Sequence, residues 1–392
     1  MSRSPLAASL PRLEDLPDLA GRRVLLRADF NVPLRDGSAG IEVADDYRIR
    51  STLPTIEWLL QRGADVTACT HLGRPKGRDP RLSVEPVKAS LARLAPDVKL
   101  LENLRYSEGE TRNDPTFVKE LTDGFDAYVN DAFGASHRAH ASIVGPPGLL
   151  LSAAGRVLYR EVEVLGGLLE SPARPFVAVV GGAKVAGKLG VLRSLLDHVD
   201  LLVVGGGMAY TFLAAQGRAV GESLLDETRL EECARLLESA GDRILLPTDV
   251  LAADIAGPGA SPDLEPTVYA GDIPAGTEAR DIGPETARRF ADAVAHASTV
   301  LWNGPLGVFE DERFAKGTRS MAEAVASSEA FTVVGGGDSV AAIDSMGFAG
   351  RIGFVSTGGG AMLELLEFGD LPGLEALRHA SHGAEVAGAK DR

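Results

Sequence analysis

The sequence predicts an α/β protein with a parallel sheet in each half of the chain. Short apolar runs alternate with helix-like segments along its length. These runs are continuous rather than alternating with polar residues, which indicates strands buried on both faces, as in parallel sheets. Most of them end in glycine or proline. A chain of 392 residues is also too long for one ordinary hydrophobic core, so we expect two domains.

The clearest strands of the first half are residues 22–30 and 64–73, and residues 51–63 between them form a helix that ends in glycine. In the second half, strands that end in glycine or proline are expected at residues 176–182, 201–207, 299–305, 331–337 and 352–360. Ligands of such sheets bind at the carboxyl ends of the strands. We therefore expect ligand sites beside the glycine clusters.

The best candidate for a connection between the two halves is residues 153–175, which have prolines near both ends. The middle of this segment carries apolar residues at helical spacing, from Val157 to Leu168. A helix between two sheets is a stiff connector about which two domains can rotate.

The composition excludes several classes of protein. Hydrophobic residues make up 45% and charged residues 24%, as in soluble globular proteins. The net charge of −15 argues against nucleic acid and anionic membranes as partners. Two cysteines, Cys69 and Cys233, cannot form a disulfide framework, so we expect a reducing, cytoplasmic setting. Neither a membrane-spanning run nor a signal peptide is evident.

Two short stretches carry most of the functional information. HLGRPKG (residues 71–77) places an imidazole, a guanidinium and an ammonium group on a turn rich in glycine and proline. GGAKVAGK (residues 181–188) places two lysines on a glycine-rich turn after an apolar strand. Both are typical of anion sites, for phosphate above all. Because they lie in different halves, we expect one phosphorylated ligand in each half and a phosphoryl group passed between them.

The second stretch has the spacing of a P-loop, but Leu189 stands where such a loop needs Ser or Thr to hold magnesium. The P-loop interpretation is therefore weak. Lys184 and Lys188 are four residues apart and would share one face of a helix, where like charges repel weakly. An anion bound between them would remove that cost, whereas the alternative is a solvated basic face.

Two further glycine clusters, GGGDS (residues 335–339) and TGGGA (residues 357–361), follow apolar strands, and a third covers residues 205–207. Glycine allows the backbone to approach a ligand closely. Asp338, directly after the first cluster, could hold Mg²⁺. Its alternative role is the N-cap of a helix.

Basic side chains gather near the expected strand ends of the first half. Singly, each would be a surface charge, but together they would form an electropositive pocket for a small polyanion. Asp29 and Asn31 end a strand and could bind hydroxyl groups of that ligand, whereas Asp131 could equally be a structural residue. The basic residues are Arg27, Arg48, His71, Arg74, Lys76, Arg105, His137, Arg138 and His140.

The sequence lacks the motifs of hydrolases and zinc enzymes, and no dedicated general base is apparent. This absence fits a transfer between groups that are already ionised, where catalysis is positioning and electrostatic stabilisation. A dehydrogenase is a weak alternative, because no G-x-G-x-x-G opens a helix with an acidic residue about 20 residues further on.

The ordered set of motifs resembles the phosphoglycerate kinase family over nearly the whole chain. The matching stretches are RADFNVP, DDYRIRSTLPTI, HLGRPKG, LENLRY, VNDAFGASHRAHAS, RPFVAVVGGAKV, VVGGGMAYTFL, DIGPET, LWNGPLGVFE, VVGGGDSVAA, STGGGAMLELLE and LPGLEAL. The resemblance implies two Rossmann-like parallel-sheet domains joined by a linker helix. It also implies a monomeric enzyme that transfers a phosphoryl group reversibly from 1,3-bisphosphoglycerate to MgADP, giving 3-phosphoglycerate and MgATP.

By this resemblance, residues 1–152 and 372–392 form the domain that binds the glycerate substrate, residues 153–172 the linker helix, and residues 173–371 the nucleotide-binding domain. The implied substrate residues are Asp29, Asn31, Arg48, His71, Arg74, Arg105 and Arg138. Those for the nucleotide are Lys188, Ala279, Asn303, Glu310, Gly336, Gly337, Asp338 and Ser339, and Asp338 also serves Mg²⁺. Arg48, Lys184, Gly337 and Gly360 would stabilise the phosphoryl group in transfer.

Several positions depart from the usual pattern of the family. Ala186 and Gly187 replace Ser-Asp, and Ala279 and Arg280 replace Gly-Leu beside the adenine. Phe354 stands in place of a histidine and Met362 in place of a serine. One strand–helix unit is also missing before LENLRY, so we expect a smaller first domain. A binding or regulatory homologue without turnover is therefore the alternative to an active enzyme.

Overall fold

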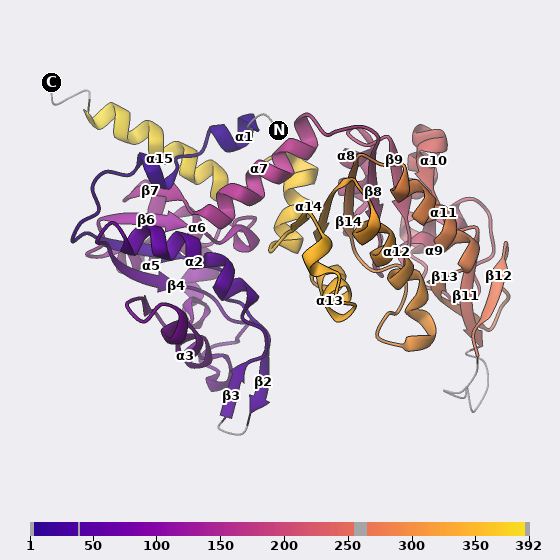
Figure 1. Cartoon of the computed structure of the whole chain (residues 1–392), viewed down its shortest axis with the longest axis horizontal. Coiled ribbons are helices and arrows are strands. Elements are labelled where there is room, and N and C mark those ends of the chain that lie inside the picture. The colour runs from indigo at the N-terminus through magenta and orange to yellow at the C-terminus, as the bar shows by residue number, and fades with distance from the viewer. Residues whose placement is uncertain (1–3, 38–39, 255–264, 389–392) are drawn as a thin grey trace. The chain divides into compact units, whose positions relative to one another are not determined.

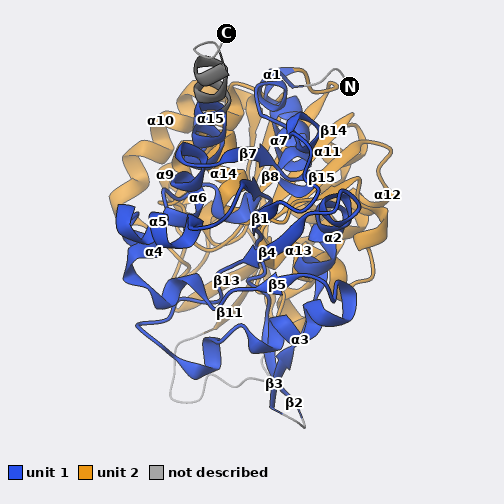
Figure 2. Cartoon of the chain, turned by 90° about the vertical axis from the view of Figure 1, so that its left-hand side faces the viewer, with its two compact units in different colours: residues 1–170, 368–392 blue, residues 171–367 orange. Residues whose placement is uncertain are grey.

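The computed structural model describes residues 4–37, 40–254 and 265–388, with side chains up to residue 380. It contains two compact units. Unit 1 comprises the residues up to Glu170 and those from Phe368 onward, and unit 2 comprises Ser171–Glu367 (Figure 2). The expected domains also included residues 1–3, 38–39, 255–264 and 389–392, which lie outside the described residues. No described helix is long and apolar enough to cross a lipid bilayer.

Unit 1 is built on a parallel sheet of five strands in the order β5-β4-β1-β6-β7, of which β4, β6 and β7 are labelled in Figure 1. The central strands are buried after their first residues, as their continuous apolar runs predict. The register pairs Arg27 with both Cys69 and Asn130, so three strands end at the same edge of the sheet. The strands are β1 (Arg23–Arg27), β4 (Asp65–Cys69), β5 (Lys99–Leu100), β6 (Ala127–Asn130) and β7 (Leu151–Ala154).

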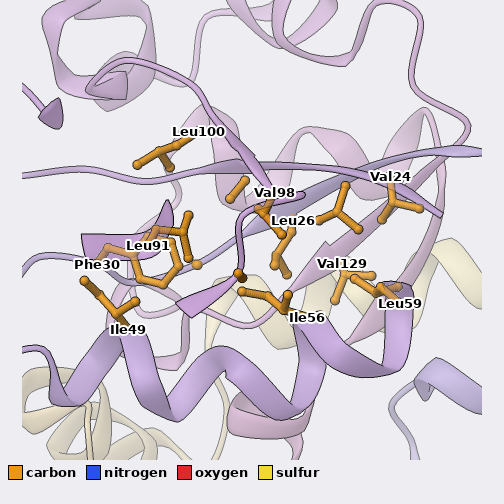
Figure 3. Packing of buried hydrophobic residues seen from close by; sticks show 14 of the residues in the cluster. Val24, Leu26, Phe30, Ile49, Ile56, Leu59, Leu91, Val98, Leu100 and Val129 are labelled. Atoms are coloured by element: carbon orange, nitrogen blue, oxygen red, sulfur yellow. The ribbon is translucent and has the colours of Figure 1, made fainter. Parts of the chain in front are cut away.

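The core of unit 1 forms where α2 (Tyr47–Leu60) packs on the sheet. Figure 3 shows Ile56 and Leu59 of this helix pointing toward sheet residues such as Leu26 and Val129, and all four side chains are fully buried. The helix begins before the predicted start at residue 51, because Ile49 also packs in this core. The other elements are α1 (Pro5–Ala8), β2 (Leu34–Gly37), β3 (Gly40–Val43), α3 (Glu85–Leu94), α4 (Glu108–Arg112), α5 (Pro115–Thr122), α6 (Ala141–Val144), α7 (Arg156–Glu170) and α15 (Pro372–Gly388).

The C-terminal helix α15 belongs to unit 1. It packs against β7 and α6. Its first turn is fixed by a hydrogen bond from the Gly373 amide to the Ser136 carbonyl at 2.9 Å, and Leu374 and Leu377 are fully buried. The apolar side chains of LPGLEAL therefore tie the end of the chain to the sheet formed by its beginning.

Unit 2 holds a parallel sheet of six strands in the order β10-β9-β8-β14-β15-β16, with a smaller antiparallel sheet in the order β12-β11-β13. The five strands predicted for this half all belong to the larger sheet. They are β8 (Phe176–Val180), β9 (Leu201–Val204), β14 (Thr299–Asn303), β15 (Phe331–Gly335) and β16 (Phe354–Val355), joined by β10 (Ile244–Leu245). The smaller sheet contains β11 (Asp249–Asp254), β12 (Thr267–Ala270) and β13 (Thr277–Ile282).

Helices connect the strands of unit 2, as the alternation of apolar runs and helix-like segments predicts. The α/β fold with parallel sheets is therefore confirmed. Each strand is shorter than its apolar run, because the glycines at the ends of the runs form the turns that follow. The helices are α8 (Leu189–Leu196), α9 (Met208–Ala215), α10 (Leu230–Ala240), α11 (Pro284–Ala295), α12 (Lys316–Ser327), α13 (Gly337–Ser345) and α14 (Gly359–Phe368).

Asp131 fixes the start of helix α7. Its Oδ1 accepts hydrogen bonds from the amides of Val157 at 2.8 Å and Leu158 at 3.3 Å. A Cβ on Gly155 would lie 2.2 Å from the same oxygen, so only glycine fits there. The helix consequently begins at Arg156, and residues 153 and 154, expected in the linker helix, belong to strand β7. Of the two roles left open for Asp131, the structure shows the structural one.

Burial raises the pKa of Asp131 to about 6, although Thr55 and two backbone amides oppose the shift. The folded state thus holds a proton that the unfolded state has released, and the free energy of unfolding should fall as pH rises from about 4 to 6. A shift of this size is worth up to about 3 kcal/mol. Urea unfolding should show a steeper fall in the wild type than in Asp131→Asn, which keeps the fall caused by Asp281, whose pKa burial raises to about 7. Equal pH slopes for the two proteins would contradict the assignment.

Candidate functional site

The carboxyl ends of β1, β4 and β6 bring several of the basic residues predicted for the site to one edge of the sheet of unit 1. Arg27 ends β1 and precedes Asp29 and Asn31. His71 and Arg74 follow β4, and Arg138 follows β6. Parallel pairing therefore places groups that are distant in sequence beside one another.

The turn that carries His71 and Arg74 is held at Gly73. The Gly73 amide donates to Asn31 Oδ1 at 2.8 Å, and Arg105 Nη1 donates to the Gly73 carbonyl at 2.6 Å. Gly73 has a φ of +62°, and a Cβ there would lie 2.8 Å from Leu82. Asn31 and Arg105 therefore shape the turn from within the chain, a role that their residue types alone did not reveal.

Asp29 and Arg48 form an ion pair, with Arg48 Nη1 at 2.5 Å from Asp29 Oδ2. Burial by itself would raise the pKa of Asp29, but the positive charges of Arg48 and Arg27 and the hydrogen bond from the Asn31 amide outweigh it and lower the pKa. Asp29 is therefore ionised at neutral pH. Its other oxygen accepts from the Asn31 amide at 3.2 Å.

His71 is a neutral hydrogen-bond donor in this site. Its Nδ1 lies 3.1 Å from Arg27 Nη2, and because a guanidinium can only donate, Nδ1 accepts and the proton resides on Nε2. Burial holds the pKa of His71 well below its usual value, with further contributions from Arg27, Arg105 and Arg48, although Asp29 acts in the opposite direction. The imidazole therefore contributes an Nε2–H group rather than a positive charge.

The remaining arginines at this edge of the sheet repel one another. Burial lowers the pKa of Arg105 to about 10, and the charges of Arg138, Arg27 and Arg74 add to this effect. Arg138 is half-buried, with its Nε donating to His137 Nε2 at 3.0 Å, and Arg74 is exposed. Several cations held together at partial burial are stabilised by a bound anion. The arrangement therefore suits a small polyanion.

In unit 2, glycines let the ends of three neighbouring strands come together. The Gly182 amide donates to the Pro305 carbonyl at 2.8 Å. A Cβ on Gly304, whose φ is +93°, would lie 2.3 Å from the Gly181 carbonyl oxygen. This close packing borders a pocket of about 220 Å³. The predicted residues Ala279, Glu310 and Asp338 all line this pocket. Its other lining residues are Gly182, Ala183, Gly206, Gly207, Tyr210, Leu224, Glu278, Arg280, Pro305, Gly307 and Val308.

Lys188 lies just before α8 and faces the strand ends. Its Nζ donates to the Gly181 carbonyl at 2.7 Å and to Asn303 Oδ1 at 2.9 Å, while Asn303 Nδ2 donates to the Gly335 carbonyl at 2.9 Å. Burial lowers the pKa of Lys188 to about 8, although Asp338 opposes the shift. An ammonium group held in this way is positioned to bind an anion.

Lys184 and Lys188 do not share a helix face, so that prediction is wrong. Helix α8 begins only at Leu189, and residues 181–188 form a turn. Gly187 lies within the turn, where glycine disfavours helix. Lys184 is exposed.

Two helices begin beside each other at the predicted glycine clusters. Gly336, with a φ of +96°, directly precedes α13, and a Cβ on Gly359 at the start of α14 would lie 2.9 Å from the Gly336 Cα. Gly337 and Gly360 lie in the first turns. Because amide groups and the positive ends of helix dipoles point outward there, the paired helix starts are suited to binding an anion.

Asp338 and Ser339 have different roles at the start of α13. Ser339 is fully buried, and its hydroxyl accepts from the Gly304 amide at 2.6 Å, which links the helix to the end of β14. Asp338 is exposed in the first turn, and the N-cap residue is Gly336. The N-cap alternative for Asp338 is therefore wrong. Among the described residues, no group of three or more His, Cys, Asp or Glu side chains forms a cage for a metal ion.

Sequence reasoning did not assign several lining residues of the pocket in unit 2. Tyr210 lies in α9 and Leu224 in the loop after it, while Glu278 and Arg280 lie on β13. Arg280 donates from Nη2 to Glu278 Oε2 at 2.6 Å. Of these residues, only Arg280 was noticeable in the sequence, as a departure from the family pattern. The loop that carries Leu224 has no motif that distinguishes it from other surface loops.

Comparison with known proteins gives one consistent result. The family model described as "Phosphoglycerate kinase" matches residues 13–100 and 95–368. A phosphoglycerate kinase of Rubrobacter xylanophilus is 50% identical over 92% of this chain and 96% of its own length. A cytosolic phosphoglycerate kinase of Triticum aestivum is 46% identical over 93% of this chain and 97% of its own length.

Solved structures of the same family share the fold. The phosphoglycerate kinase of Coxiella burnetii has a TM-score of 0.84 and 38% identity, covering 94% of this chain and 99% of its own. That of Pyrococcus horikoshii has a TM-score of 0.82 and 30% identity, covering 95% and 100%. The two stretches matched by the family model overlap at residues 95–100.

The environment of His71 predicts its behaviour in solution. Because Arg27 occupies Nδ1 and the pKa is lowered, the imidazole should stay neutral and protonated at Nε2 between about pH 6 and 8. Imidazole ¹⁵N NMR, assigned with a His71→Gln variant, measures this directly. A titration midpoint near the ordinary pKa of about 6.5 would contradict the neutral state, and a neutral ring protonated at Nδ1 would contradict the tautomer.

Proposed function

Because the chain belongs to the phosphoglycerate kinase family, we propose that unit 1 holds the phosphoglycerate and unit 2 the nucleotide of the family's reaction. That reaction transfers a phosphoryl group reversibly from 1,3-bisphosphoglycerate to ADP, giving 3-phosphoglycerate and ATP in glycolysis. The enzyme is a phosphotransferase with a carboxyl group as acceptor. The observation that supports the proposal is that groups suited to binding anions lie at the strand ends of each of the two sheets.

The site of unit 1 suits 3-phosphoglycerate, which carries a phosphate and a carboxylate. Arginines bind both groups through pairs of parallel hydrogen bonds. The neutral His71 Nε2–H can donate to an oxygen without adding charge, and Asp29 orients Arg48 through their ion pair. The proposed substrate residues remain Asp29, Asn31, Arg48, His71, Arg74, Arg105 and Arg138.

The site of unit 2 suits a nucleoside phosphate. Leu224, Val308 and Ala279 give the pocket apolar walls for a base, and the starts of α13 and α14 with Lys188 receive the phosphates. Asn303 and Ser339 keep Lys188 and the helix start in place. The proposed nucleotide residues are Lys188, Ala279, Asn303, Glu310, Gly336, Gly337, Asp338 and Ser339.

The nucleotide is proposed to enter as its Mg²⁺ complex. Mg²⁺ keeps several waters and needs only one or two carboxylates besides the substrate phosphates. Asp338 fits this requirement, since it is exposed beside the phosphate site and lines the same pocket as Glu310. When bound, Mg²⁺ would neutralise part of the phosphate charge.

The chemistry proposed for this chain needs no general base. In the direction of ATP use, an oxygen of the ionised 3-phosphoglycerate carboxylate attacks the γ-phosphorus, and the bond to the ADP oxygen breaks. No proton moves in this step. We assign Arg48, Lys184 and the amides of Gly337 and Gly360 to the charge of the phosphoryl group in transfer.

The ligands of two units must meet for transfer to occur. We therefore propose that the units close about α7, the helix within residues 153–172, and exclude water from the transferred group. A monomer in the cytoplasm, without nucleic-acid or membrane partners, is the proposed setting. The wheat relative is named as cytosolic, and the net charge of −15 disfavours polyanionic partners.

Steady-state turnover with 3-phosphoglycerate and MgATP, coupled to reduction of the bisphosphoglycerate formed, tests the reaction. An active enzyme should turn over at about 10 s⁻¹ or faster. Binding of both ligands without turnover would identify the alternative, a binding homologue, to which the departures at Gly187, Ala279, Arg280 and Phe354 point.

Lys184→Ala should lower kcat about 10²-fold or more while changing the Kd for MgADP little, because the lysine acts mainly on the charge in transfer. Stopped-flow turnover and calorimetric binding measure the two effects. Lys119→Ala on the exposed surface of α5 is the matched control. Unchanged turnover in Lys184→Ala would remove this lysine from the mechanism.

Arg138→Ala should weaken 3-phosphoglycerate about tenfold or more, as expected for loss of a charge-assisted contact, and leave the Kd for MgADP unchanged. Titration calorimetry with each ligand alone measures the Kd for 3-phosphoglycerate and the Kd for MgADP separately. If both ligands weakened equally, the assignment of separate sites would be wrong.

A further inference from the structure

One buried carboxylate of unit 1 has no role in the reaction described above. Glu110, in the short helix α4, is fully buried. Its Oε2 accepts from the Ser142 amide at 2.9 Å, and its Oε1 accepts from the Ser142 hydroxyl at 2.7 Å. The nearest ring nitrogen, Nδ1 of the buried His140, lies 3.7 Å from Oε1. The carboxylate is thus held by both hydrogen-bond donors of a single serine.

Ser142 passes this contact on to Arg27. Its hydroxyl hydrogen is donated to Glu110, so the same oxygen is free to accept, and Arg27 Nε donates to it at 2.8 Å. Ser142 and Arg27 are both fully buried. The serine therefore transmits the orientation of the carboxylate to the guanidinium and lies between opposite charges.

Arg27 in turn fixes His71. Its Nη2 lies 3.1 Å from His71 Nδ1, and this contact determines the Nε2–H tautomer. The chain of contacts from Glu110 to His71 crosses four segments: α4, α6, the end of β1 and the turn after β4. The orientation of each side chain in this chain of contacts is fixed by its hydrogen bond to the preceding one.

Glu110 also balances the charge of the site. Its negative charge acts on Arg105 and His140 in the direction opposite to Arg138 and Arg27. Without it, the cations around the buried Arg27 would lose one of the carboxylates that balance them, and Asp29 would remain. An unbalanced buried charge is costly and tends to move toward water.

We propose that Glu110 is a positioning residue of the phosphoglycerate site, acting through Ser142 and Arg27 to hold His71 with its Nε2–H directed to the ligand. The part concerning the ligand depends on the proposed function of unit 1. Glu110 itself does not touch the substrate. Its effect is to keep a hydrogen-bond donor in one tautomer and one place.

The test compares Glu110→Gln and Ser142→Ala with Glu108→Gln. Glu108 lies on the same helix, but it is exposed and pairs with Arg112, so it controls for loss of an acidic residue in α4. Both test variants should raise the KM for 3-phosphoglycerate about 10-fold or more, as expected for a misplaced binding group, and leave the KM for MgATP unchanged. Imidazole ¹⁵N NMR should show His71 leaving the pure Nε2–H tautomer.

A double variant tests whether Glu110 and Ser142 act along the same path. Because both changes interrupt one path, Glu110→Gln combined with Ser142→Ala should weaken 3-phosphoglycerate little more than the stronger single change. Additive effects on the KM for 3-phosphoglycerate would overturn the path. Ser142→Ala keeps the carboxylate and the charge, so it tests the path even if Glu110→Gln does not fold.

Folded variants with an unchanged KM for 3-phosphoglycerate and an unchanged His71 tautomer would overturn the proposal and leave Glu110 a purely structural residue. The tautomer is read without turnover, so it does not depend on activity. A wild type without turnover or 3-phosphoglycerate binding would instead overturn the proposed function. The two failures are therefore distinguishable.

Discussion

The guanidinium of Arg27 sets the organisation of unit 1, because a buried charge needs hydrogen-bond partners on several sides. Its three nitrogens reach Ser142, the Ala28 carbonyl and His71. These partners come from α6, from the segment after β1 and from the turn after β4. The parallel register brings these segments to one edge, and the arginine holds them there. The anion site is thus an extension of the structural contacts around one buried cation.

Unit 2 meets the requirement of an anion site in another way. Glycines follow its strand ends, so backbone atoms of the turns after β8 and β14 pack where a single Cβ would collide. The same absence of side chains exposes amide groups at the starts of α13 and α14. Positive potential in this unit therefore comes largely from the backbone and from Lys188, whereas unit 1 uses arginine side chains. The two devices suit different ligands, a nucleoside phosphate and a small compound with two acidic groups.

The sequence was sufficient for the features that depend on local patterns. Continuous apolar runs predicted β8, β9 and β15, because strands buried on both faces have no polar positions. Glycine clusters predicted the turns that follow the strands of unit 2. Contacts between distant segments could not be predicted in this way. The sequence around Glu110 does not indicate that its hydrogen-bond partner is Ser142, 32 residues away. The hydrogen bonds from the start of α7 to Asp131 depend on tertiary packing in the same way.

The central claim is that each unit binds its own ligand at the carboxyl edge of its sheet. Hydrogen–deuterium exchange of the full chain, with 3-phosphoglycerate alone and with MgADP alone, tests it most directly. We expect 3-phosphoglycerate to protect the turns at residues 71–77 and 103–106, and MgADP to protect residues 181–188 and 335–339. Protection of the same segments by both ligands would contradict two separate sites.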